Sequence, residues 1–258
     1  MNRLKNLFQT KQKNILSVFC TAGFPELNSI ETVLEELQNN SVDLVEIGMP
    51  FSDPTADGPV IQYSNSIAIN NGMMLKVLFE QIKNIRSKIQ IPLILMGYIN
   101  PALQYGFDNF LRDANACGID GIIIPDLPVY EYEAFYKEKF EQYNIKNIFL
   151  ITPQTSEDRI RKIDSLSDAF IYVVSSNAIT GGNSNIEQEQ QKYFERIKNM
   201  QLKNPTLIGF GIKDKHTFDM ACQYANGAII GTAFINSIDN SKNLKKDIQQ
   251  FVQKIKSV

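Results

Sequence analysis

The sequence predicts an α/β protein, a single (β/α)8 barrel (TIM barrel) with an additional N-terminal helix. The first observation is an alternation that runs from end to end, in which each short apolar run is followed by a polar turn and an amphipathic stretch. The second is that this unit occurs eight times. The third is the length of 258 residues, which is the usual size of an eight-unit barrel.

The predicted strands are apolar at nearly every position and do not alternate, as expected for parallel strands that are buried on both faces. Many of their residues are β-branched, and turn-forming residues bound most of the runs. In chain order these strands are Ile15–Cys20, Leu44–Ile47, Leu93–Met96, Gly121–Ile124, Ile148–Ile151, Phe170–Val174, Leu207–Gly209 and Ala228–Ile230.

Helical periodicity occupies the segments between these strands, with apolar residues recurring every three or four positions. Before the first strand, Leu4, Leu7 and Phe8 have the same spacing and predict a short helix packed on the body of the protein. Ser156, which precedes two acidic residues, is a predicted N-cap. The later helices are Leu27–Leu37, Leu75–Ile85, Phe107–Ala116, Glu131–Gln142, Glu157–Ser165, Glu187–Met200, Lys215–Ala225 and Asn243–Ile255.

An open, doubly wound parallel sheet would show the same alternation and is the second possibility from the pattern alone. No linker rich in Pro, Gly or Ser and no low-complexity block interrupts the alternation. We therefore expect one TIM-barrel domain over residues 1–258.

Composition excludes several classes of partner. The formal net charge is −2 and no basic cluster is interleaved with aromatic residues, so a nucleic-acid partner is not expected. No apolar run approaches the roughly 18 residues that a membrane-spanning helix needs, and the N-terminus lacks the apolar core of a signal peptide. The three cysteines are far apart and odd in number, which argues against a disulfide framework. A cytoplasmic protein is expected.

Active sites of (β/α)8 barrels lie at the carboxyl ends of the strands, where Glu46 and Asp57 are the first candidates. Glu46 interrupts an apolar strand, and burial there would raise its pKa toward the range useful for acid–base catalysis. Asp57 follows eleven residues later, in a loop that could fold back over the strand end. Two carboxyl groups in different surroundings can divide acid and base roles. The alternatives are a buried ion pair for Glu46 and a turn or helix N-cap for Asp57.

Further polar residues follow other predicted strands. Tyr98, Asn100 and Asp126 could line the pocket mouth, although a turn or cap role is at least as consistent with their positions. The segment from Asn177 to Asn185 is long and rich in small residues, which is typical of a loop that closes over a ligand.

The last two predicted strands end in glycines. The seventh strand ends in Gly209-Phe210-Gly211, and Gly231-Thr232 opens a short helix after the eighth. Backbone N–H groups and a helix N-terminus at these two neighbouring strand ends are the elements of a barrel phosphate site.

Two absences narrow the chemistry. No cluster of His, Cys, Asp or Glu has metal-ligand spacing, and the single histidine, His216, looks like part of a helix start. No predicted strand ends in a lysine that could form a Schiff base, and Lys213 stands beyond the turn. The residues therefore predict acid–base chemistry by carboxyl groups, without a metal, on a small phosphorylated molecule.

Four motifs closely resemble the signatures of the tryptophan synthase alpha subunit family, and the likeness covers essentially the whole chain in the same order. They are EIGMPFSDPTADGPVIQ at 46–62, MGYINP at 96–101, IPDLP at 124–128 and GFGI at 209–212. The resemblance implies a carbon–carbon lyase of tryptophan biosynthesis, and so of aromatic amino-acid biosynthesis. Such an enzyme cleaves indole-3-glycerol phosphate into indole and glyceraldehyde 3-phosphate by a metal-free retro-aldol reaction.

The resemblance also implies roles for individual residues. Glu46 would take the glyceryl hydroxyl proton and serve protonation at indole C3. Asp57 would accept a hydrogen bond from the indole N–H and stabilise positive charge on the ring. Substrate-binding positions would be Phe19 in the indole pocket, Tyr172 and Thr180 at the pocket and closing loop, and Gly181, Gly211, Gly231 and Thr232 in the phosphate cradle.

A partner is implied in the same way. The family resemblance predicts a beta subunit in an allosteric α2β2 heterotetramer, with pyridoxal phosphate bound by the beta subunit and no cofactor in this chain. We expect Met49–Pro59 and Asn100–Tyr105 to surround the barrel mouth and Asp53 to contact the partner, with Phe51 and Pro54 as apolar anchors. Ser176 and Ala178 depart from the residues that many family members carry in the closing loop.

Two other interpretations stay open at this point. One is a different phosphate-binding barrel enzyme, such as an isomerase or another aldolase, which the Glu46 and Asp57 pair argues against. The other is a non-catalytic subunit that only activates a partner.

Overall fold

The structure, a computed structural model, describes residues 2–175, 184–209 and 211–256. In these residues eight parallel strands form a closed barrel in chain order, with β8 returning to pair with β1. The (β/α)8 prediction is confirmed, and the open-sheet alternative is wrong. The strands are β1 (Ile15–Thr21), β2 (Leu44–Gly48), β3 (Leu93–Met96), β4 (Gly121–Ile123), β5 (Lys146–Ile151), β6 (Ile171–Val174), β7 (Thr206–Gly209) and β8 (Gly227–Ile230).

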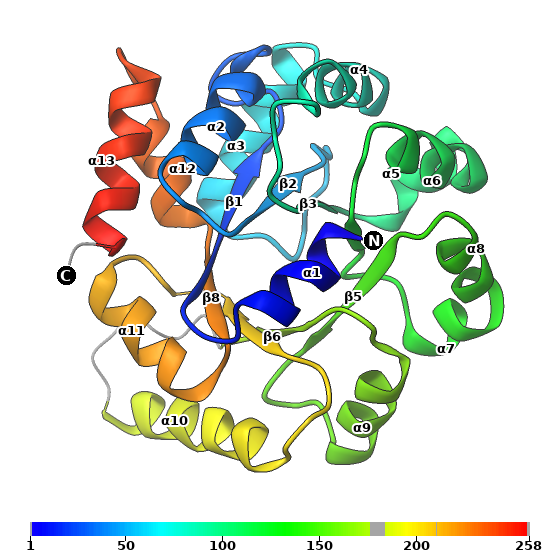
Figure 1. The fold of residues 1–258 in the computed structure, drawn as a ribbon, viewed down its shortest axis with the longest axis vertical. Coiled ribbons are helices and arrows are strands. Elements are labelled where there is room, and N and C mark those ends of the chain that lie inside the picture. The colour runs from blue at the N-terminus through cyan, green and yellow to red at the C-terminus, as the bar shows by residue number, and fades with distance from the viewer. Residues whose placement is uncertain (1, 176–183, 210, 257–258) are drawn as a thin grey trace.

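Helices surround the barrel on its outer side (Figure 1). None of those in the described part of the chain is long and apolar enough to cross a membrane. They are α1 (Arg3–Thr10), α2 (Ser29–Asn39), α3 (Pro59–Asn70), α4 (Leu75–Ile85), α5 (Ile99–Tyr105), α6 (Phe107–Ala116), α7 (Val129–Glu131), the π-helical turn η1 (Tyr132–Tyr136), α8 (Lys137–Gln142), α9 (Glu157–Leu166), α10 (Ser184–Asn199), α11 (Lys215–Tyr224), α12 (Thr232–Ile238) and α13 (Leu244–Lys256).

Side chains of the strands alternate between the barrel interior and the layer beneath the helices. In β1, Ile15 belongs to the interior cluster, whereas Leu16 and Val18 pack in the larger core between strands and helices. Both layers are apolar, which explains why the strand sequences do not alternate. Some positions that face the interior are polar. They include Ser17 in β1 and Glu46 in β2, and both of these side chains are completely buried.

The N-terminal helix closes the amino end of the barrel. Figure 1 shows α1 crossing the ring of strands, and its Leu4 is fully buried in the interior cluster. Asn2 caps α1 by accepting a hydrogen bond from Leu4 N at 3.0 Å, and it donates to Asp120 O at 2.9 Å. The Asp120 carboxylate, which precedes β4, accepts from Arg3 N at 3.1 Å and pairs with buried Arg86 at 2.8 Å. The predicted additional helix is confirmed.

Candidate active site

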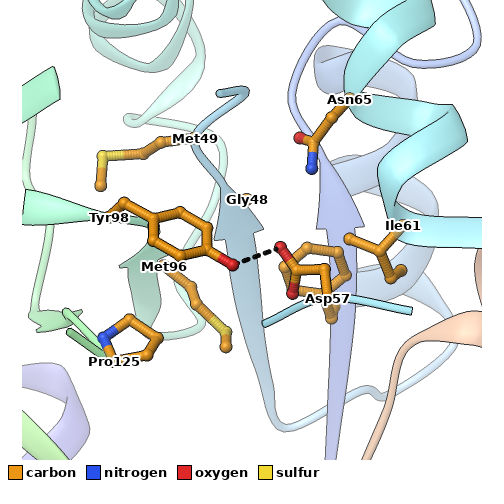
Figure 2. A pocket seen from close by; sticks show the side chains of 10 residues that line it. Gly48, Met49, Asp57, Ile61, Asn65, Met96, Tyr98 and Pro125 are labelled. Atoms are coloured by element: carbon orange, nitrogen blue, oxygen red, sulfur yellow. Dashed lines mark hydrogen bonds between the residues drawn. The ribbon is translucent and has the colours of Figure 1, made fainter. Parts of the chain in front are cut away.

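A pocket opens at the carboxyl ends of the first four strands, the end of the barrel opposite α1 (Figure 2). Apolar side chains make most of its wall, while Asp57, Asn65 and Tyr98 bring polar atoms to it. Such a mixture of an apolar wall and a few polar groups is typical of small-molecule sites. The lining residues are Phe19, Gly48, Met49, Asp57, Ile61, Asn65, Met96, Gly97, Tyr98 and Pro125.

Asp57 lies in the loop between β2 and α3 and is held by Tyr98. The Tyr98 hydroxyl accepts a hydrogen bond from Ala56 N at 2.9 Å and donates one to Asp57 Oδ2 at 3.3 Å (Figure 2). Partial burial raises the pKa of Asp57 above its usual value, and the Tyr98 hydrogen bond opposes that shift. The helix-cap alternative for Asp57 is wrong, because Gly58 is the N-cap of α3 and Pro59 is its first residue.

Glu46 lies deeper, inside the barrel, and is completely buried. Its Oε1 accepts a hydrogen bond from Ser17 Oγ at 2.9 Å, while its Oε2 has no partner among the described residues. Burial raises the pKa of Glu46 to about 8, and the Ser17 hydrogen bond acts in the opposite direction. In the described part of the chain no Lys, Arg or His pairs with Glu46, so the ion-pair alternative has no support there.

Tyr172 interacts electrostatically with both Glu46 and Asp57. It is the second residue of β6 and is buried in the interior cluster, and burial raises its pKa well above 10. The negative charges of Glu46 and Asp57 add to this shift, so Tyr172 is close enough to feel both. The structure therefore brings Tyr172 of β6 close to Glu46 of β2 and to Asp57 of the loop that follows β2.

Glycines at strand ends make room for the pocket side chains. A Cβ at Gly48 would stand 2.5 Å from Phe19 Cζ, and one at Gly97 would stand 2.8 Å from Met49 Cε. A Cβ at Gly209 would overlap Cζ in the ring of Tyr172. No side chain larger than hydrogen fits at these positions without displacing its neighbour. Gly209 was predicted to belong to a phosphate site, and no role was predicted for Gly48 or Gly97.

The remaining lining residues were not recognised from sequence. Ile61 and Asn65 come from α3, and Figure 2 shows them on the side of the pocket opposite Tyr98. Both follow Asp57 in a helix that was not among the predicted helices. Their spacing of four residues, one helical turn after a candidate site residue, is the signal that could have identified them.

The predicted phosphate-binding residues stand at the ends of β7 and β8. Gly211 is exposed and has a φ of +73°, a conformation that favours glycine. Gly231 precedes α12, and Thr232 is the first residue of that helix. The φ of Gly231 is −115°, so its backbone conformation does not itself require glycine. A Cβ there would lie 3.5 Å from Phe19 Cβ, which places this end of β8 beside the pocket.

Other predicted residues have different outcomes. Asn100 is exposed on α5, and Asp126 Oδ1 accepts a hydrogen bond from Ile99 N at 2.9 Å at the start of that helix. Asp126 itself stands in a turn, which is one of the alternatives for this residue, and the N-cap residue of α5 is Tyr98. Asp53 is exposed, as a partner contact requires, and Phe51 is half-buried with its ring 5.3 Å from that of Tyr98. Pro54 is buried, so it offers no surface anchor in the free chain.

Several predictions lie outside the described residues. Thr180 and Gly181, together with Ser176 and Ala178, belong to the undescribed segment 176–183. His216 lies near the start of α11, as expected. Within the described ranges no three His, Cys, Asp or Glu side chains are grouped to hold a metal ion.

Comparison with known proteins identifies the family of the chain. A family model described as "Tryptophan synthase alpha chain" matches residues 4–258. The tryptophan synthase alpha chain of Flavobacterium psychrophilum is 53% identical over 99% of this chain and 100% of its own length. That of Christiangramia forsetii is 51% identical over 100% of both.

Solved structures agree. The alpha chain from Legionella pneumophila has a TM-score of 0.88 at 28% identity and covers 99% of this chain and 96% of its own. A chain of the tryptophan synthase complex from Pyrococcus furiosus has a TM-score of 0.85 at 31% identity, over 96% of this chain and 99% of that one. The chain described here belongs to the tryptophan synthase alpha chain family.

Proposed function

We propose that the chain is a carbon–carbon lyase that cleaves indole-3-glycerol phosphate into indole and glyceraldehyde 3-phosphate, the tryptophan synthase alpha reaction of tryptophan biosynthesis. The observation that carries the proposal is the placement of two carboxyl groups with different surroundings at one barrel end. Glu46 is buried and free at one oxygen among the described residues, and Asp57 is half-buried and bonded to Tyr98. Such a pair can divide the proton transfers and the charge stabilisation of the reaction between them.

Glu46 moves the protons. The glyceryl hydroxyl loses its proton and becomes the aldehyde, the bond from that carbon to indole C3 breaks, and its electron pair returns to the ring. The reaction also adds one proton at C3, so the proton taken from the hydroxyl can be the one delivered to carbon. A carboxyl group with a pKa of about 8 can both give and take a proton near neutral pH.

Asp57 stabilises the cationic ring. Protonation at C3 places positive charge on the indole nitrogen, and an ionised carboxylate that accepts the N–H bond stabilises that charge. The hydrogen bond from Tyr98 favours the ionised form of Asp57 and fixes its position over the pocket. The apolar wall formed by Phe19, Met96 and Ile61 suits a flat aromatic ring.

The phosphate group binds at the ends of β7 and β8. Gly181, Gly211, Gly231 and Thr232 form its cradle, and Thr180 belongs to the loop that closes over the substrate. The first turn of a helix leaves backbone N–H groups without partners within the helix, and α12 begins at Thr232. The proximity of Gly231 to Phe19 supports a substrate that spans the ring pocket and the cradle.

The chain acts with a beta subunit in the cytoplasm, in an α2β2 heterotetramer whose pyridoxal phosphate is bound by the beta subunit. The relative from Pyrococcus furiosus is part of a tryptophan synthase complex, which supports such a partner. Asp53, which is exposed in the loop that also carries Asp57, is the residue of this chain that we assign to the contact. No cofactor takes part in the steps assigned to Glu46 and Asp57.

An assay of indole release from indole-3-glycerol phosphate tests the proposal with the purified chain alone and with beta subunit added. Release by wild type but not by a Glu46→Gln, Asp57→Asn double variant is expected. No release under either condition would favour a non-catalytic subunit that only activates its partner.

A further inference from the structure

The hydrogen bond between Ser17 and Glu46 joins two polar side chains that are buried in the barrel interior. Ser17 Oγ donates to Glu46 Oε1 at 2.9 Å, and both residues have no exposed surface. In the barrel register Ser17 pairs with Leu44 and Phe19 pairs with Glu46, so the serine stands diagonally beside the carboxyl group. Ser17 is thus directly beneath Phe19 on the same face of β1.

The two oxygens of the Glu46 carboxyl group have different surroundings. Oε1 is engaged by a hydroxyl donor, whereas Oε2 is buried without a hydrogen-bond partner in the described part of the chain. A hydrogen bond to one oxygen fixes the rotation of the carboxyl group and lowers the basicity of that oxygen. The second oxygen is left as the one that can bond to a substrate.

We propose that Ser17 is a positioning residue for catalysis, which holds Glu46 by Oε1 so that Oε2 exchanges the proton with the substrate. This inference rests on the proposed function of Glu46 as the acid–base group. It adds a residue that does not touch the substrate and that works by fixing the orientation and ionisation of the one that does.

The charges around Glu46 are consistent with this role. Cys20 on β1 and Tyr172 on β6 are the titratable groups that interact electrostatically with Glu46 in the described residues. Burial raises the pKa of Cys20 to about 12 and that of Tyr172 well above 10, so both are neutral near pH 7. Ser17 is therefore the described group that favours the ionised form of Glu46 against its burial.

Three variants of Ser17 separate a positioning role from a packing role. Ser17→Ala removes the donor, Ser17→Cys keeps a side chain of similar shape with only a weak donor, and Ser17→Thr keeps the hydroxyl. The measurement is the pH dependence of kcat and KM for indole release, with thermal unfolding of each variant as the control for packing.

In the Ala and Cys variants we expect the rising limb of the kcat profile to move up by about one pH unit or more, because a hydrogen bond to a charged group is lost. That shift lowers kcat at neutral pH by roughly tenfold, with KM nearly unchanged, and Ser17→Thr restores the wild-type profile. Unchanged pH profiles in the Ala and Cys variants, whatever their unfolding temperatures, would overturn the proposal.

A second measurement does not depend on turnover. The infrared difference between wild type and Glu46→Gln isolates the carboxyl stretch of protonated Glu46, and the same difference is taken in the Ser17→Ala background. The stretch should move to higher frequency in that background, since its hydrogen-bond donor is gone, and an unmoved stretch contradicts the proposal. An inactive wild type, or a fully active Glu46→Gln variant, would instead refute the proposed function of Glu46.

Discussion

Tyr98 holds Asp57 across the pocket mouth by donating its hydroxyl proton to Asp57 Oδ2 at 3.3 Å, while accepting from the neighbouring Ala56 N–H at 2.9 Å. The phenol therefore both positions the loop between β2 and α3 and favours an ionised Asp57. These two effects can be measured separately.

Tyr98→Phe removes the hydroxyl and keeps the ring. We expect the pKa of Asp57 to rise further, because partial burial is then unopposed, and indole release to fall by roughly tenfold. The loss should be largest on the acid side of the pH profile, where Asp57 becomes protonated. A uniform loss at all pH values would show that Tyr98 acts only by holding the loop.

Asp57→Asn keeps the shape of the side chain and removes its charge. Loss of an aligned electrostatic partner in a site of this kind should lower kcat by about 10²–10³-fold without unfolding the protein. Asp53→Asn is the matched control, since it makes the same change in the same loop at an exposed position and should leave the isolated chain close to wild type. Near-native turnover of the Asp57 variant would remove this carboxylate from the mechanism.

Glu46→Gln should lower activity by roughly 10²–10⁴-fold, since an amide cannot shuttle protons. It should also change how stability depends on pH. The pKa of Glu46 in the folded chain is about 8, above the ordinary value of 4.5. Below pH 4.5 this carboxyl group is therefore protonated in both the folded and the unfolded chain, and no charge has to be buried on folding. Between 4.5 and 8 only the unfolded chain loses its proton, and wild type is progressively destabilised relative to the variant.

Chemical denaturation of both proteins at several pH values across that window measures this difference. If Glu46 belonged to a buried ion pair, the variant would instead be the less stable protein at neutral pH.

Substitutions at the two cradle glycines should weaken phosphate binding by different routes. Gly211→Ala strains a backbone with a φ of +73°, whereas Gly231→Val meets no such strain and acts through its bulk beside Phe19. We expect both to raise the Kd for glycerol 3-phosphate several-fold or more and to change that for indole much less. Calorimetric titration with each ligand provides the comparison. Equal effects on the two ligands would place the phosphate elsewhere.

Asp53→Ala should matter chiefly in the complex. Because Asp53 is exposed and is assigned to the contact with the beta subunit, its loss should reduce activation by that subunit more than it reduces the activity of the isolated chain. Indole release by wild type and variant is compared with and without saturating beta subunit. Reduction of both activities by the same factor would place Asp53 inside the active site.

Periodicity predicted the fold well because both layers of the barrel are apolar, but it missed elements that depend on single residues. The helix α5 was not among the predicted helices, and its Pro101 lies in the first turn, where no N–H donor is needed. The segment Glu131–Gln142 contains a π-helical turn that adds one residue to a helical repeat. The strand β5 begins with polar Lys146 and Asn147, which an apolar-run criterion excludes.

For the site, the rule that barrel chemistry lies at carboxyl strand ends led directly to Glu46 and Asp57. Their surroundings depend on contacts between units, which one sequence does not contain. Ser17 looks like an ordinary strand residue until the register of β1 against β2 brings its hydroxyl to Glu46. Likewise, the role of Gly48 becomes visible only when Phe19 occupies the space that a Cβ would fill.

The helix α1 adds an apolar layer at the amino end of the barrel. Its Leu4 is fully buried in the cluster of side chains that fills the barrel interior. The described pocket lies at the other end, so a substrate enters and a product leaves on the carboxyl side of the strands. A partner bound over that side would therefore receive the product directly.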